Sequence, residues 1–135
     1  MKLDLKFLVV SYIIGLFIDW VFQWSWQANN KSRWGKNDNK MLSLAAVTSH
    51  ALVYALLTSF ITLPLIGKMS HFLTVFTTLF ISHAIIDTRI PVKYLMRFKG
   101  MSWEEIYDYK NSGFMHIGID HRLHEIVLLV LAMII

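Results

Sequence analysis

The chain has 135 residues, of which 56% are hydrophobic and only 16% are charged. Soluble globular proteins carry about a quarter of charged residues, so this composition excludes an ordinary soluble domain and indicates a lipid bilayer as the solvent. The absence of cysteine excludes disulfides and thiolate metal sites, and a net charge of +4 without any recognition motif gives no support for a nucleic-acid partner. By length the chain is a single domain, residues 1–135.

Four apolar stretches follow one another, each close to the ~20 residues that a helix needs to cross the hydrocarbon layer. They cover residues 7–28, 41–65, 71–91 and 113–135. No small-residue cleavage site follows the first stretch, which argues against a cleavable signal peptide. The fourth is the stretch most interrupted by polar residues. The pattern predicts an all-α polytopic membrane protein, a four-transmembrane-helix bundle.

The three connections between these stretches differ in character. Residues 29–40 form a short, basic, turn-rich loop, whereas Gly67 to Ser70 make a tight turn that predicts a helical hairpin. Residues 92–112 are charged and rich in aromatic side chains, which predicts a short interfacial helix in this third loop. We expect a break at Gly100, with Ser102 and Glu105 in a capping-box pattern.

Lysine and arginine are concentrated in the two longer connections, and few lie near the termini or in the tight turn. The positive-inside rule then predicts that the longer loops are cytoplasmic and that both termini lie outside the cytoplasm. The basic loop of residues 29–40 would also suit anionic lipid head groups or a phosphate-bearing substrate. Its charge is explained by topology alone, which is the simpler interpretation.

Acids, amides and histidines recur at a similar distance from the cytoplasmic end of each apolar stretch. With 1.5 Å of rise per residue, most of them fall in one layer roughly 10–17 Å below the cytoplasmic boundary. Three pairs have i, i+4 spacing, which puts both members on one helix face: Asp19/Gln23, His83/Asp87 and Asp120/His124. The polar layer consists of Asp19, Gln23, His50, His83, Asp87, Asp120, His121 and His124.

Ionisable groups inside membrane spans are costly and usually mark function. Histidine and carboxylate side chains from facing helices are how bundles build metal sites, and both suit zinc, manganese or iron. We therefore predict a divalent transition metal held by His50, His83, Asp87, Asp120 and His124. The predicted acid–base groups are Asp19, Asp120 and Glu125, and His121 is a further group that would bind or orient the metal.

A structural alternative is that the polar side chains only join the helices, each hydrogen bond contributing about 1 kcal/mol. That reading is favoured for His50 taken alone. The two acid–histidine pairs on the third and fourth stretches, together with Asp19, exceed what helix association requires. For His71 and His116 we expect an interfacial or solvated position.

In order, the segments FIDWVFQ, SHALVYALL, SHAIID and IDHRLHE resemble a family of small bacterial and phage membrane proteins called DUF3307, a domain of unknown function. The matching positions are Asp19/Gln23, His50/Tyr54, His83/Asp87 and Asp120/His124, and Lys31 matches a lysine after the first segment. His121 departs from the family, where glutamine is more usual. The resemblance implies a bacterial inner-membrane protein, with Gln23, Lys31, Tyr54 and His121 in supporting roles, but it implies no activity.

Three functions compete at this stage. The first is a metal-dependent hydrolase of a lipid-linked or phosphorylated substrate. A looser similarity to small membrane-bound metal-dependent hydrolases also favours this function. The second is a non-enzymatic protein, either a proton or ion pathway or a phage-type membrane effector that assembles as a homo-oligomer. The third is a purely structural role of the polar layer. We favour the first.

Overall fold

The computed structural model describes residues 3–31 and 39–135, and every element in these ranges is an α-helix. The helices are α1 (Leu5–Val21), α2 (Ser25–Lys31), α3 (Lys40–Ile66), α4 (Met69–Asp87), α5 (Ile90–Phe98), α6 (Trp103–Tyr107) and α7 (Tyr109–Ile134). The all-α class is therefore confirmed. Residues 32–38, the centre of the predicted basic loop, lie outside the described residues.

α3 and α4 form the helical hairpin that the sequence predicts. α3 ends at Gly67, whose positive φ of 64° closes the helix in a conformation that suits glycine. With 27 and 19 residues, these are the two described helices that are each long and apolar enough to cross a membrane unaided. They correspond to the second and third predicted spans, except that the third ends at Asp87 and not near residue 91.

The first predicted span is not continuous. α1 ends at Val21, and α2 begins at Ser25 at an angle of 97° to it, so residues 7–28 form a broken span or a re-entrant segment. The Gln27 side chain fixes this bend: its Oε1 accepts from the Trp24 N–H at 3.0 Å, and its Nε2 donates to Ser49 on α3 at 3.0 Å. One local and one tertiary hydrogen bond thus hold the bend in a chain whose apolar pattern continues through it.

The third connection contains two helices where one was expected. α5 and α6 are separated at Gly100, and Ser102 caps α6 in a complete capping box with Glu105, as predicted. α7 starts at Tyr109, four residues earlier than the predicted fourth span, and has 26 residues. It is long enough to cross a bilayer, but Asp120, Arg122 and Glu125 interrupt its apolar character.

The distribution of side chains is that of a protein dissolved in lipid. The main core is packed by residues from α1, α3, α4 and α7, among them Phe7, Tyr54, Leu79 and Leu131. Polar side chains are also buried inside, whereas large apolar ones cover the outside, for example Phe60, which is 59% exposed. Exposed apolar surface on this scale needs a nonaqueous environment, and the fold is accordingly that of a helical membrane protein.

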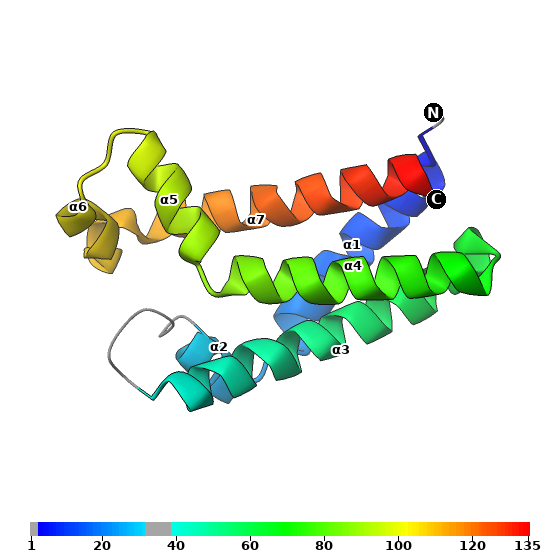
Figure 1. Cartoon of the computed structure of the whole chain (residues 1–135), viewed down its shortest axis with the longest axis horizontal. Helices are drawn as coiled ribbons and strands as arrows, with labels where there is room; N and C mark the ends of the chain where they lie inside the picture. Colours follow the sequence, from blue (N-terminus) through cyan, green and yellow to red (C-terminus); the bar gives the residue numbers. More distant parts are fainter. Residues whose placement is uncertain (1–2, 32–38) are drawn as a thin grey trace.

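The two ends of the chain lie close together. Figure 1 shows both termini and the α3–α4 turn at one end of the molecule, and α2, α5 and α6 at the other. The N–H of Asp4 donates to the carbonyl of Ala132 at 2.8 Å, which joins the start of α1 to the end of α7.

Candidate metal centre

Five side chains from four helices meet inside the bundle, and we call them the Asp/His cluster. They comprise Asp19 of α1, His50 of α3, His83 and Asp87 of α4, and His124 of α7. His50, His83 and Asp87 are buried, while Asp19 and His124 are half-buried. Two overlapping triads, Asp19–His50–His83 and His83–Asp87–His124, each have their ligand atoms within 4.8 Å of one another. Residues from the predicted polar layer are thus brought together.

Asp19 and His50 form the shortest contact of the cluster. His50 Nε2 donates to Asp19 Oδ1 at 2.8 Å, and the amide of Gln23 lies 3.3 Å from the same nitrogen. The prediction that Asp19 and Gln23 share a helix face is wrong, because α1 ends at Val21. Gln23 reaches His50 from the bend between α1 and α2.

Asp87 is the charge centre of the other side of the cluster. Its Oδ2 lies 3.1 Å from the ammonium of Lys31 and 3.5 Å from Nε2 of both His50 and His83. Lys31 is the last residue of α2, and a straight continuation of α1 would carry it roughly 18 Å beyond Asp19. The 97° bend brings it back to Asp87.

Packing fixes the orientation of His83. Its ring stacks on Tyr54 at a centroid distance of 4.0 Å, and the His124 ring lies 4.2 Å away on α7. Tyr54 in turn reaches over Gly15 of α1, where an added Cβ would lie 2.5 Å from the phenol oxygen. A glycine at this position allows α1 to approach α3 closely enough to enclose the tyrosine.

The histidines of the cluster have ring nitrogens without partners. Nδ1 of His124 lies 2.9 Å from the backbone carbonyl of Asp120, and because a carbonyl only accepts, this nitrogen carries the proton. In the neutral ring, Nε2 then has a free lone pair, and it is buried without a hydrogen-bond partner. Within the described ranges neither nitrogen of His83 is hydrogen-bonded either. Buried polar atoms of this kind require an explanation such as an ion.

The candidate ligand atoms lie close enough together that small side-chain shifts would place them around one metal ion. Ligands at about 2.0–2.2 Å from one ion are separated from each other by about 3.0–3.5 Å in octahedral or tetrahedral geometry. His83–Asp87 at 3.5 Å lies at the edge of this range, whereas His83–Asp19 is longer at 3.9 Å and His50–Asp19 is at hydrogen-bond distance, 2.8 Å. His124 also has the arrangement common in metal sites, in which a backbone carbonyl orients one nitrogen and leaves the other for the metal.

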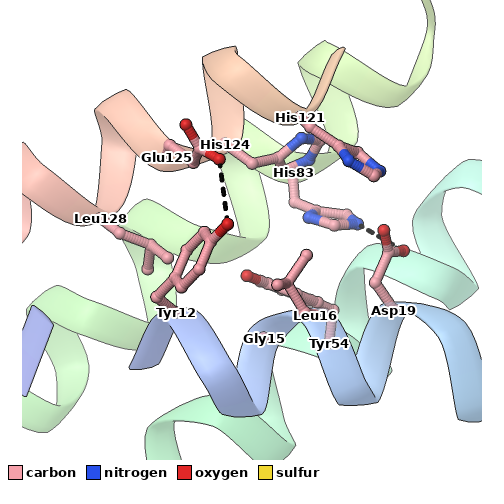
Figure 2. A pocket seen from close by; sticks show the side chains of 10 residues that line it. All are labelled: Tyr12, Gly15, Leu16, Asp19, Tyr54, His83, His121, His124, Glu125 and Leu128. Carbon is pink, nitrogen blue, oxygen red and sulfur yellow. Dashed lines mark hydrogen bonds and ion pairs between the residues drawn. The ribbon is translucent and has the colours of Figure 1, made fainter. Parts of the chain in front are cut away.

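A small cavity of about 20 Å³ adjoins the cluster between α1 and α7. This volume holds about one water molecule or an ion of similar size. Figure 2 shows Asp19, His83 and His124 on one side of it and Tyr12, Leu16 and Leu128 on another. The cluster therefore borders a small, partly open space that both polar and apolar side chains line.

Three predicted site residues lie around the cluster without joining it. The Glu125 carboxylate accepts from Tyr12 at 3.3 Å and is paired with Arg122, so it points away from the histidines. Asp120 belongs to neither triad, although its Oδ1 is buried without a hydrogen-bond partner. It lines a neighbouring polar cleft with His121, which also borders the small cavity.

The sequence interpretation of His116 was wrong. The side chain is fully buried, its Nε2 donates to the carbonyl of Ile106 at 2.9 Å, and its ring stacks on Tyr109. It joins α6 to α7 and is not solvated. Arg89, which was not among the predicted site residues, lines the same polar cleft as Asp120.

Comparisons of the chain with models of known protein families, with curated proteins and with solved structures found no match. The resemblance to DUF3307 therefore stays a prediction. The class of the protein, a helical membrane protein with buried acid–histidine groups at metal-binding distance, rests on its own fold and side chains.

Proposed function

We propose that this chain is a four-span membrane protein whose Asp/His cluster binds a divalent transition metal and carries out hydrolysis. In this proposal α1 and α7 cross the bilayer beside the α3–α4 hairpin. Two observations support this arrangement: the four helices share one core, and both termini lie at the same end of the molecule as the α3–α4 turn. Of the polar residues that interrupt α7, Asp120 lines the polar cleft and Glu125 borders the small cavity, whereas Arg122 is exposed and pairs with Glu125.

The observation that best supports the metal proposal is the environment of the His83 ring. Its ring is fully buried and fixed between Tyr54 and His124, and neither nitrogen makes a hydrogen bond with any described residue. Nε2 nevertheless lies 3.5 Å and 3.9 Å from two carboxylates. A histidine that only joined helices would use a nitrogen for a hydrogen bond, because leaving it unmade costs about 1–3 kcal/mol.

A metal bound here would supply a water whose pKa is lowered toward ~7 and would polarise the bond to be cleaved. The residues have distinct parts in such a site. Asp19 borders both the small cavity and the polar cleft, so it is placed to take a proton from water. Lys31 balances the charge of Asp87, and Tyr54 holds the His83 ring.

The proposed substrate is a lipid-linked or phosphorylated amphiphile. The cluster lies toward the end that carries α2, α5 and α6, which the charge pattern predicts to be cytoplasmic. The resemblance to DUF3307 implies that the membrane is a bacterial inner membrane. A site at that depth is within reach of lipid head groups.

Element-specific analysis of the purified protein tests the metal site. We expect close to one zinc, manganese or iron ion per chain, and its loss in His83→Ala. His71→Ala is the matched control, because His71 lies on the same helix near the other end. A wild-type protein that contains no transition metal, and takes up none when it is supplied, would refute the proposal.

A further inference from the structure

We propose that the polar cleft beside the Asp/His cluster is a subsite for a phosphate group, and that Arg89 is its recognising residue. This inference rests on the proposed function, since it names the group that the same centre would act on. The cleft has a volume of about 240 Å³. Its polar lining consists of Asp19, Gln23, Lys31, Arg89, Asp120 and His121. Asp19 connects it to the cluster.

Arg89 is available for a ligand. Among the three arginines that the structure describes, Arg97 donates to the carbonyl of Met101 and Arg122 pairs with Glu125. The half-buried guanidinium of Arg89 makes no hydrogen bond or ion pair within the described part of the chain. A partly desolvated guanidinium in a polar cleft is expected to bind an anion, and its planar donors match phosphate oxygens.

The backbone of Arg89 indicates that this side chain is required at its position. Its φ of 60° and ψ of 8° put it in the left-handed region, and it is the one described non-glycine residue with a positive φ. Glycine or asparagine adopts this conformation at lower cost. Strained residues of this kind cluster at functional sites. The turn carries the chain from α4 into α5 and leaves Arg89 two residues after Asp87.

The other charges of the cleft place a phosphate close to Arg89, because Asp19 and Asp120 make the remaining lining acidic. The ammonium of Lys31 is already bound to Asp87 at 3.1 Å, and it adds positive charge at the inner wall of the cleft. Asp120 lies on α7 with one oxygen that has no partner, so it would repel an anion placed at its own wall. Phosphate is the usual anionic group at the lipid head-group level, which is where the charge pattern puts this end of the bundle.

The test is calorimetric binding of two probes to the full-length protein in detergent micelles. The probes are inorganic phosphate and a short-chain phosphatidic acid, which distinguish a free phosphate from a lipid head group. The variant is Arg89→Asn, because asparagine tolerates the left-handed backbone. Lys99→Asn is the control, since it removes one exposed positive charge from the same connection.

We expect at least one probe to bind the wild type, and Arg89→Asn to weaken that binding roughly 10- to 100-fold, the range for loss of a charge-assisted hydrogen bond. Lys99→Asn should bind as the wild type does. If only the phosphatidic acid binds through Arg89, the ligand is a lipid. The inference is overturned if neither probe binds or if Arg89→Asn binds both like the wild type.

Two further measurements keep the outcomes separate. If Arg89→Asn lacks a normal melting transition, Arg89→Gly takes its place, because glycine has no penalty at positive φ. Metal content is measured on every sample. A metal-free protein with Arg89-dependent phosphate binding would refute the metal centre alone, whereas a metal-loaded protein indifferent to Arg89 would refute the subsite alone.

Discussion

The ammonium of Lys31 lies 3.1 Å from Asp87 Oδ2, and the two side chains are only 9% and 1% exposed. This ion pair joins the end of α2 to the end of α4 across 56 residues of sequence. Because both groups have left solvent, each depends on the other for its charge to be balanced.

Replacing Lys31 by methionine should destabilise the fold. The substitution keeps most of the side-chain length but leaves the Asp87 carboxylate buried beside two imidazoles, a change that typically costs about 3–5 kcal/mol. Unfolding in mixed micelles with increasing denaturing detergent measures the loss. Lys110→Met, at an exposed position, should change the free energy of unfolding by less than about 0.5 kcal/mol. Equal stabilities of the two variants would contradict a structural role of the pair.

Gly15 provides a second test, because it controls how closely α1 approaches Tyr54. An added methyl group would lie 2.5 Å from the Tyr54 oxygen, so α1 or the tyrosine must move. We expect Gly15→Ala to destabilise the protein by about 1–3 kcal/mol, as overpacking usually does, and to loosen the stacking of Tyr54 on His83.

Gly118→Ala is the control for this substitution. Nothing lies within 4 Å of a Cβ added at Gly118, which is in the interior of α7. Alanine there should stabilise the helix by up to about 1 kcal/mol. Thermal unfolding of both variants checks the opposite signs, and destabilisation by Gly118→Ala alone would count against the close approach at Gly15.

Much of the helical architecture could be predicted from the sequence, since it depends on local signals. Gly67 ends α3 where the apolar stretch stops, and Ser102 with Glu105 forms the expected capping box. The bend between α1 and α2 has no such signal. No proline or glycine interrupts the segment from Trp20 to Trp26, and its apolar residues continue through the bend. The bend depends on hydrogen bonds to residues distant in sequence, as Gln27 shows.

The candidate site could be predicted only in part, because the sequence indicates the depth of a side chain but not its tertiary contacts. Similar depth in several apolar stretches was enough to single out His50, His83, Asp87 and His124. Depth does not show which way a side chain points around its helix, or where a helix breaks. It therefore could not distinguish these cluster residues from Glu125, whose side chain turns toward Tyr12. Lysine in a basic segment is usually solvated, and only the fold shows that α2 buries Lys31 against Asp87.

The capping box of α6 predicts a pH dependence outside the bundle. The backbone N–H of Ser102, and next its hydroxyl, donate to the Glu105 carboxylate and lower the pKa of this group below its ordinary value of 4.5. The folded state therefore binds the proton more weakly than the unfolded state. The stabilisation is complete above pH 4.5 and is lost as pH falls through the lowered pKa.

Hydrogen exchange of the α6 amides, corrected for intrinsic exchange rates, measures this effect. Protection should fall below pH 4.5 in the wild type, while Glu105→Gln should have weaker protection that changes little over the same range. Amides at the centre of α3 serve as the internal reference. A wild-type profile as flat as that of Glu105→Gln would contradict the assignment.

Metal addition should stabilise the protein through the Asp/His cluster and through no other histidine. A ligand that binds only the folded state adds about 2.7 kcal/mol at a hundredfold excess over its Kd. After treatment with a chelator, the wild type should regain roughly this amount when zinc or manganese is supplied. His124→Leu should lose most of the gain, because the substitution removes the free Nε2 lone pair.

His116→Leu is the matched control on the same helix. It also removes a buried imidazole, but the Nε2 of His116 already donates to the Ile106 carbonyl. It should lower stability by about 1 kcal/mol with or without metal, and its metal-dependent gain should equal that of the wild type. Equal gains in all three proteins would mean that the ion binds elsewhere.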